Sequence, residues 1–152
     1  MKITEELKIK DSIDSRHLAH INILYTAGIV YNRILKLLKP FNLTPEQFNV
    51  LRIINGNKPN PISIKEISSR MIDKSSNVSR ILDRLEIKLM VERKKSFADK
   101  RAASIILTPL GQSIINDVSK EMDPALQTLV NLSQSEAIQL NQLLDKVNDL
   151  TQ

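Results

Sequence analysis

Residues 73–101 read DKSSNVSRILDRLEIKLMVERKKSFADKR, and this stretch decides the fold. Its first half spaces apolar side chains as one buried face of a helix, which we expect to begin near Ser75. The side chains expected to be buried are Val78, Ile81, Leu82, Leu85 and Leu89. The second half predicts strands at residues 91–96 and 102–107, joined by a short basic loop. A helix followed by a two-stranded hairpin is the end of a winged helix.

The sequence before this stretch predicts three more helices. Helical spacing runs from about Ser15 to Lys39 and is closed by Pro40. Thr44 and Gln47 form the pattern of a capping box around a proline at the first helical position, which predicts a helix that ends at residues 55–57. A minimal strand at residues 62–63 and a short helix over residues 64–71 follow.

The sequence after the hairpin predicts two further helices. Thr108 and Pro109 repeat the cap-plus-proline signal, and Asp123-Pro124 is expected to kink or interrupt the helix that they start. Residues 133–136 form another capping box. The last helix is expected to bury Leu140, Leu143, Leu144, Val147 and Leu150.

The expected fold class is mainly α, an α+β winged helix-turn-helix with a two-stranded wing and additional terminal helices. We expect one domain over residues 1–152, with a winged-helix lobe at about 44–108. The helices at about 15–40 and 109–152 carry more apolar surface than a small lobe can cover. They therefore predict a dimerisation region.

Charge is distributed unevenly along the chain. Residues 65–101 carry 11 basic and 6 acidic side chains, whereas residues 108–152 carry 2 and 6. A basic segment of this kind indicates a nucleic-acid partner. The chain has no cysteine, which excludes disulfides and thiolate metal sites. No stretch has the length of a membrane span or the apolar core of a signal peptide, so we expect a cytoplasmic protein without a membrane partner.

The predicted helix in the opening stretch has the side chains of a DNA-reading helix. Short polar side chains at its start let the backbone approach a groove: Ser75, Ser76, Asn77 and Ser79. Arg80 and Arg84, one turn apart, are long enough to reach base edges or phosphates. The alternative is an ordinary surface helix with charge pairs.

The predicted hairpin adds a second basic element. Lys94 and Lys95 lie on its first strand, and Lys100 and Arg101 lie at its tip. An arginine there suits the minor groove, where the potential is most negative. Asp99 is expected to hold the tip through Arg101 or loop amides. The alternative is a solvated hairpin.

Catalytic and metal-binding patterns are weak in this sequence. His17 and His20 are spaced as two zinc ligands could be, but no third or fourth ligand stands out. The sequence shows no catalytic triad pattern and no glycine-rich phosphate loop. We therefore expect no enzyme, no cofactor and no metal.

Several segments together resemble the MarR family of bacterial transcription regulators. They are residues 43–51 (LTPEQFNVL), 73–86 (DKSSNVSRILDRLE), 91–93 (VER), 99–101 (DKR) and 107–111 (LTPLG). Their order and spacing match over about residues 15–150. Two positions depart from the family pattern, because Ile72 and Leu89 stand where glycine is usual. Leu89 implies strain or a different turn after the helix.

The resemblance implies a homodimer on a pseudo-palindromic operator in double-stranded DNA. The residues from Ser75 to Arg84 named above would face the major groove, and Arg101 with Asp99 the minor groove. Repression by operator occlusion is the expected mode, with activation as the alternative, and a small-molecule effector is expected to relieve repression. Side chains suggested for effector binding are His17, Ile21, Tyr25 and Phe48.

Two competing interpretations remain. A winged-helix module could use its basic hairpin to bind an acidic protein, without DNA specificity and as a monomer. A ligand-binding or catalytic helical protein would need a polar pocket that the sequence does not reveal.

Overall fold

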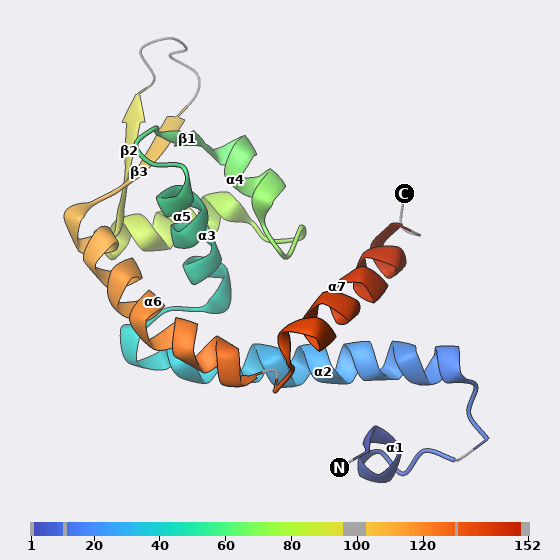
Figure 1. The fold of residues 1–152 in the computed structure, drawn as a ribbon. Helices are drawn as coiled ribbons and strands as arrows, with labels where there is room; N and C mark the ends of the chain where they lie inside the picture. Colours follow the sequence, from blue (N-terminus) through green and yellow to red (C-terminus); the bar gives the residue numbers. More distant parts are fainter. Residues whose placement is uncertain (1, 11, 96–102, 130, 150–152) are drawn as a thin grey trace. The chain divides into compact units, whose positions relative to one another are not determined.

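The computed structural model describes residues 2–10, 12–95, 103–129 and 131–149. The elements follow one another as α1 (Ile3–Glu6), α2 (Ser15–Leu38), a 3-10 turn (Lys39–Phe41), α3 (Pro45–Gly56), β1 (Ile62–Ser63), α4 (Ile64–Arg70), α5 (Val78–Ile87), β2 (Val91–Lys95), β3 (Ala103–Leu107), α6 (Pro109–Leu129) and α7 (Gln134–Asn148). This order confirms the mainly α, winged helix-turn-helix class (Figure 1). The chain forms two compact units, residues 1–119 and 120–152.

The predicted capping box fixes the start of α3. The Gln47 amide N–H donates to the Thr44 hydroxyl, and the Thr44 amide N–H donates to Gln47 Oε1, both at 3.3 Å. Pro45 occupies the first helical position, as expected. The helix buries Val50, Leu51 and Ile54 in the core of the lobe. Burial of these side chains is what anchors the rest of the lobe to α3.

The sheet has three antiparallel strands in the order β1-β3-β2. Ile62 of β1 lies opposite Ile105 of β3, and Val91 of β2 lies opposite Leu107. The side chains of Ile62 and Ile105 are fully buried, so the wing is rooted in the core of the lobe. The minimal strand predicted at residues 62–63 is thereby confirmed.

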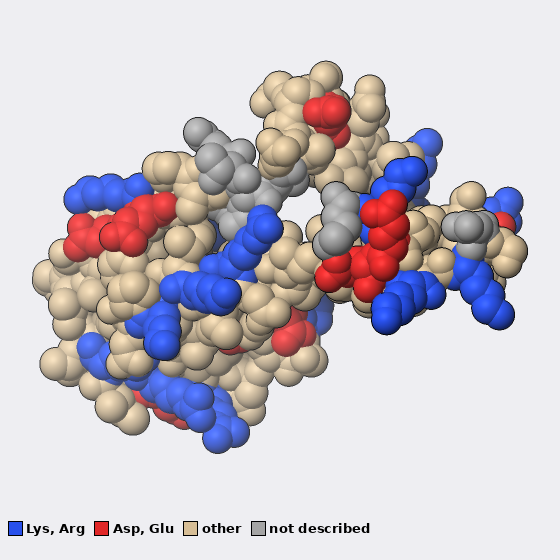
Figure 2. All heavy atoms as spheres, turned by 90° about the horizontal axis from the view of Figure 1, so that it is seen from below, with Lys and Arg blue, Asp and Glu red and all other residues tan. Residues whose placement is uncertain are grey.

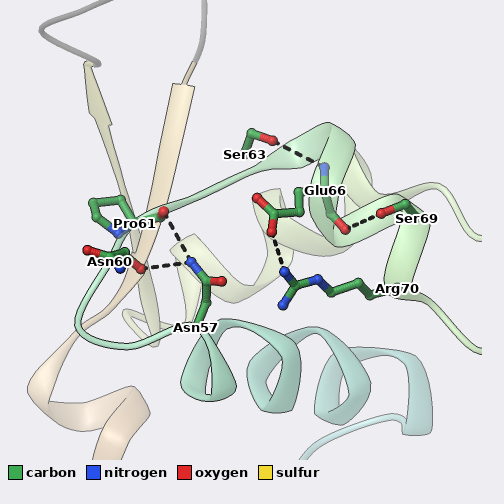
Figure 3. Close-up of polar contacts among 7 residues, drawn as sticks. All are labelled: Asn57, Asn60, Pro61, Ser63, Glu66, Ser69 and Arg70. Atoms are coloured by element: carbon green, nitrogen blue, oxygen red, sulfur yellow. Dashed lines mark hydrogen bonds and ion pairs between the residues drawn. The ribbon is translucent and has the colours of Figure 1, made fainter.

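Local polar contacts cap α4 and shape the loop that precedes it (Figure 3). The Ser63 hydroxyl accepts from the Glu66 amide at 3.1 Å and caps the helix. Arg70 pairs with Glu66 one turn earlier. In the preceding loop, Asn57 Nδ2 donates to the carbonyls of Asn60 and Pro61. These contacts fix both ends of the connection between α3 and α4.

The helix α5 begins three residues later than expected. Its N-cap is Asn77, whose Oδ1 accepts from the Arg80 amide at 3.0 Å. Ser75 and Ser76 lie in the preceding turn, where the Asp73 carboxylate accepts from both hydroxyls. Serine hydroxyls and aspartate compete with the helix for hydrogen bonds, which explains the later start.

The long helix α2 is confirmed, capped at its start by Asp14 Oδ1, which accepts from the Arg16 amide at 2.9 Å. Leu38 is its only buried residue. Other apolar side chains on it stay open, including Leu24, which is 62% exposed. One chain therefore leaves much of the apolar surface of α2 uncovered.

The second unit contains the end of α6 and all of α7. Helix α6 runs through Pro124, so the helix is not interrupted at Asp123-Pro124, and the expected alternative of a kink there stays a prediction. The capping box of Ser133 and Glu136 is confirmed. The expected burial along α7 is wrong for the single chain, because Leu140, Leu143 and Val147 are exposed and Leu144 is only half-buried. Leu150 lies outside the described residues. An apolar stripe of this kind needs a partner surface that one chain does not supply.

Candidate nucleic-acid interface

The exposed face of α5 carries the polar residues that the sequence singled out. Val78, Leu82 and Leu85 are buried beneath the helix, which packs on α3 and α4. Ile81, expected to be buried, is half-buried. The opposite face exposes Ser79, Arg80, Asp83 and Arg84. The helix is thus held rigidly from behind while hydroxyl and guanidinium groups remain open to a partner.

The turn before α5 is organised by Asp73. Its Oδ1 accepts from the Ser75 amide at 2.9 Å and from the Ser75 hydroxyl at 2.7 Å, and its Oδ2 accepts from the Ser76 hydroxyl at 3.2 Å. The hydrogen bond from the Ser75 hydroxyl is the main cause that lowers the pKa of Asp73. The hydroxyl groups of Ser75 and Ser76 donate their protons in hydrogen bonds to the Asp73 carboxylate. The lone pairs of both hydroxyl oxygens can therefore accept a hydrogen bond from a partner.

Arg93 ties the first wing strand to α5. Its Nη2 pairs with Asp83, and its Nε lies 3.6 Å from Glu86 Oε2. The same Nη2 lies 3.5 Å from the Ser79 carbonyl. These contacts use the guanidinium within the lobe, so Arg93 serves to orient α5 against β2.

The end of α5 forms a Schellman motif. The Met90 amide donates to the Leu85 carbonyl at 3.0 Å, and the Leu89 amide donates to the Glu86 carbonyl at 2.9 Å. Leu89 occupies the left-handed position with φ 57°, and its side chain is 69% exposed. The expectation that Leu89 is buried is wrong, because the left-handed turn directs its side chain away from the core. Leu89 therefore keeps the left-handed turn in which glycine is usual, and strain at this position stays a prediction.

A second contact joins this turn to α6. The Thr108 hydroxyl donates to the Leu89 carbonyl at 2.6 Å and accepts from the Gly111 amide at 3.0 Å. The Thr108 amide donates to the Met90 carbonyl at 3.1 Å. A Cβ at Gly111 would lie 2.0 Å from the Met90 oxygen. Only glycine allows this approach of α6 to the end of α5.

The turn at Ile72 is unstrained by contrast. Ile72 does not have a positive φ. Its amide N–H donates to Asn49 Oδ1 at 3.1 Å. Asn49 is buried, so a core side chain fixes the turn that glycine usually makes. The side chain of Ile72 is 80% exposed.

The wing is described only at its base. Lys94 lies on β2 and its Nζ is 3.3 Å from Glu92 Oε1. Lys95 ends β2, opposite Ala103. Asp99, Lys100 and Arg101 lie outside the described residues, so their predicted contact with the minor groove stays a prediction.

Comparison with known proteins relates this chain to one protein family. Residues 43–103 match the family model described as the MarR family. The chain is 33% identical over 126 residues to the HTH-type transcriptional regulator MgrA of Staphylococcus aureus, covering 82% of this chain and 84% of MgrA. The chain belongs to the MarR family of transcription regulators.

Solved MarR-family structures share the fold. Apo wild-type MarR from E. coli is 28% identical with a TM-score of 0.65, and the match covers 90% of this chain and 98% of MarR. A DNA complex of S. aureus MepR matches with a TM-score of 0.77 at 23% identity, covering 93% of this chain and 100% of MepR. The second likeness shows the fold alone. This MarR-family chain is a DNA-binding transcription regulator and not an enzyme.

Three of the four side chains suggested for effector binding, His17, Ile21 and Tyr25, lie one turn apart along α2, and Phe48 lies on α3. His17 is exposed, and Ile21 and Tyr25 are half-buried on α2. Phe48 is half-buried on α3, which meets α2 where the Tyr31 hydroxyl donates to Glu46 at 3.0 Å. His17 precedes Tyr31 by 14 residues, or roughly 20 Å of helix. Their role in effector binding stays a prediction.

Reasoning from sequence missed several residues that shape this interface. Asp73 and Asn49 hold the turn before α5, and Arg93 holds the wing strand. The sequence predicts Thr108 as the cap of α6, but not its contact with Leu89 at the end of α5. An aspartate two residues before a serine is a recognisable turn signal. The contacts of Asn49 and Arg93 span 23 and 10 residues, and no local pattern reveals them. Within the described residues, no group of three or more potential metal ligands is present, and His20 is exposed on α2.

Proposed function

We propose that this MarR-family regulator binds a pseudo-palindromic operator through α5 and represses transcription by occluding it. The observation that carries the proposal is the exposed Ser79–Arg80–Arg84 face on a helix whose other face is buried. Helices of this kind place their first turns in the major groove. Arg80 is proposed to read bases, and Arg84 and Lys94 to contact phosphates.

Further contacts complete the proposed interface. Ser75, Ser76 and Asn77 would approach the backbone of the major groove beside the start of α5. Lys95 and Lys100 would add phosphate contacts, and Arg101 would enter the minor groove with Asp99 holding it. The MepR complex supports this proposal, because a protein of the same fold forms a complex with DNA.

A homodimer is the proposed working form. The open apolar side chains of α2 and α7, such as Leu24 and Leu143, exceed what an isolated surface usually exposes. A second copy would cover them and present two α5 helices to successive major grooves, about 34–36 Å apart. Sedimentation at several protein concentrations tests this arrangement, and a purely monomeric chain contradicts it.

A small-molecule effector is proposed to relieve repression, and the protein is proposed to act in the cytoplasm, where bacterial operators lie. Selection of bound fragments from random duplex DNA would identify the operator. We expect one enriched inverted repeat whose affinity falls steeply with salt. No enrichment over random duplex, together with binding to acidic proteins, would instead favour a protein-interaction module.

A further inference from the structure

The turn before α5 presents hydrogen-bond acceptors to a partner. Ser75 donates its hydroxyl proton to Asp73 Oδ1 at 2.7 Å, and Ser76 donates its own to Oδ2 at 3.2 Å. The Ser75 amide N–H also donates to Oδ1, at 2.9 Å, and the Ser76 amide N–H donates to the Asp73 carbonyl at 3.3 Å. The donors of both serines therefore already have partners inside the turn. The lone pairs of the two hydroxyl oxygens are what the serines can offer to a ligand.

The charge of the turn is negative and is not neutralised within the lobe. The hydrogen bond from the Ser75 hydroxyl is the main cause that lowers the pKa of Asp73, so the carboxylate stays ionised near neutral pH. Within the part of the chain that the structure describes, no ion pair joins Asp73 to a cation. Lys74 is next in the chain, but its Nζ donates to the Ser69 carbonyl of α4 at 2.6 Å. The carboxylate and the two acceptor oxygens therefore disfavour a direct contact between this turn and a phosphate group.

These acceptors lie beside the donors of α5. Ser76, Asn77 and Arg80 line one hollow of the surface next to the start of α3. The Arg80 amide N–H donates to Asn77 Oδ1 at 3.0 Å, which leaves the Asn77 Nδ2 group as a donor. Acceptors at residues 75–76 are thus followed along the same surface by donors at residues 77 and 80.

Other basic side chains can supply the attraction to phosphate groups. Figure 2 shows Lys and Arg side chains spread over the part of the molecule that holds the lobe. Residues 65–101 carry 11 basic and 6 acidic side chains. Affinity for the DNA backbone therefore does not depend on the turn before α5, which leaves its acceptors to act on base edges.

Base edges in the major groove differ in what they offer to an acceptor. Cytosine offers its N4 amino group and adenine its N6 amino group, whereas guanine and thymine present acceptor oxygens there. We infer that the turn at residues 73–76 reads the exocyclic amino group of a cytosine or an adenine in each operator half-site. Ser75 and Ser76 accept from the amino group, and Asp73 positions their protons away from it. The inference rests on the proposed function and narrows the contacts of both serines from the backbone of the groove to base edges.

Deletion of single amino groups from the DNA tests the inference on the unchanged protein. In the selected operator, each adenine is replaced in turn by purine, which lacks the N6 amino group, and each cytosine by 2-pyrimidinone, which lacks the N4 amino group. We expect one such deletion per half-site to lower the affinity of the parent about tenfold, because an acceptor loses its donor. The same replacements outside the inverted repeat are the control and should leave the affinity unchanged. The replacement that weakens binding identifies which of the two bases is read.

Serine variants localise this dependence on the amino group. In Ser75→Ala/Ser76→Ala, the deletion that costs the parent about tenfold should cost about threefold or less, because the accepting oxygens are gone. Ser79→Ala is the matched control: it changes an exposed serine in the first turn of α5 and should keep the full dependence. Thermal unfolding of both variants checks that they fold.

Asp73→Asn gives an outcome that misfolding cannot imitate. Asparagine has one acceptor oxygen for two serine hydroxyls, so at least one proton is released, and the negative charge is lost. We expect the affinity for a scrambled duplex to rise about threefold, while the preference for the operator over that duplex falls. Asp145→Asn removes the same charge from an exposed position on α7 and should change neither value.

Three results would overturn the inference. They are an operator preference that no amino deletion weakens, a serine double variant that keeps the tenfold dependence, and an Asp73→Asn variant that binds the scrambled duplex no better than the parent. A parent without any operator preference would contradict the proposed function itself, and this result is distinct from the other three.

Discussion

The Thr108 hydroxyl donates a hydrogen bond of 2.6 Å to the carbonyl of Leu89. This bond joins the left-handed residue that ends α5 to the residue that caps α6. Because α5 carries the proposed DNA-reading face and α6 belongs to the proposed dimerisation region, this contact connects the two. Its rigidity should therefore set how α5 is aimed.

Leu89→Gly should stabilise the fold. A non-glycine residue in the left-handed region costs roughly 1–2 kcal/mol of folding free energy, which glycine avoids. Part of this benefit is lost because glycine has greater conformational freedom in the unfolded chain. We expect the free energy of unfolding to rise by about 1 kcal/mol in urea titrations. Ile72→Gly is the matched control, because Ile72 has no positive φ, and it should lower stability. Equal effects of the two variants would show that the strain at Leu89 is not real.

Gly111→Ala should be strongly destabilising. Its Cβ would meet the Met90 carbonyl oxygen at 2.0 Å and the carbonyl carbon at 2.8 Å, so the backbone itself must move. Overpacking of this kind costs about 1–3 kcal/mol or more. Gly56→Ala has open space around its Cβ and should be neutral or slightly stabilising. Thermal unfolding of the pair checks the prediction, and comparable melting temperatures would refute it.

Removal of the ion pair between Arg93 and Asp83 should change the affinity for DNA more than it changes the stability of the fold. The Asp83 side chain is 58% exposed, so solvent screens the pair and it contributes only about 0.2–1 kcal/mol to folding. A double-mutant cycle with Arg93→Met and Asp83→Asn measures the coupling energy between the two side chains, once in operator affinity and once in the free energy of unfolding. We expect stability within about 1 kcal/mol of the parent and a several-fold loss of operator affinity. A coupling that appears in stability alone would exclude the orienting role.

Asp73 should give a pH-dependent contribution to stability. Its pKa in the folded protein is lowered, mainly by the Ser75 hydroxyl, below an ordinary value of about 3.9. The contribution is therefore fully present above the unfolded pKa and is lost as pH falls through the lower folded pKa. Ser75→Ala should move the pKa of Asp73 back up in a carboxyl NMR titration, whereas Ser113→Ala should leave it unchanged. An Asp73 that titrates identically in all three proteins would contradict the described turn.

Local signals predicted the elements well. The capping boxes at Thr44 and Ser133 mark helix starts through hydrogen bonds within four residues, so sequence alone locates them. The start of α5 was placed too early because Asp73 draws Ser75 and Ser76 into a turn of their own. The apolar spacing includes Leu89, which lies beyond the end of α5 at Ile87. Spacing alone cannot show that the backbone at Leu89 turns into the left-handed region.

Longer-range features could not be predicted in the same way. Burial along α7 was expected from its apolar stripe, but one chain leaves Leu143 60% exposed. Arg93 is one of several basic residues in its segment of the sequence, and only its contact with Asp83 places it within the lobe. The residues around Lys88 come from α2, α3 and α5, which are separate in sequence. Such relations arise from packing and not from local spacing.

The most direct test of the account is the specificity ratio of Arg80→Ala, measured by fluorescence anisotropy at fixed salt on the selected operator and on a scrambled duplex. The parent should prefer the operator strongly, and the variant should lose about 1–3 kcal/mol of that preference. Lys58→Ala, an exposed change in the loop after α3, should keep the parent ratio. If Arg80→Ala retains the full ratio, or the parent has no preference, α5 is not the reading element.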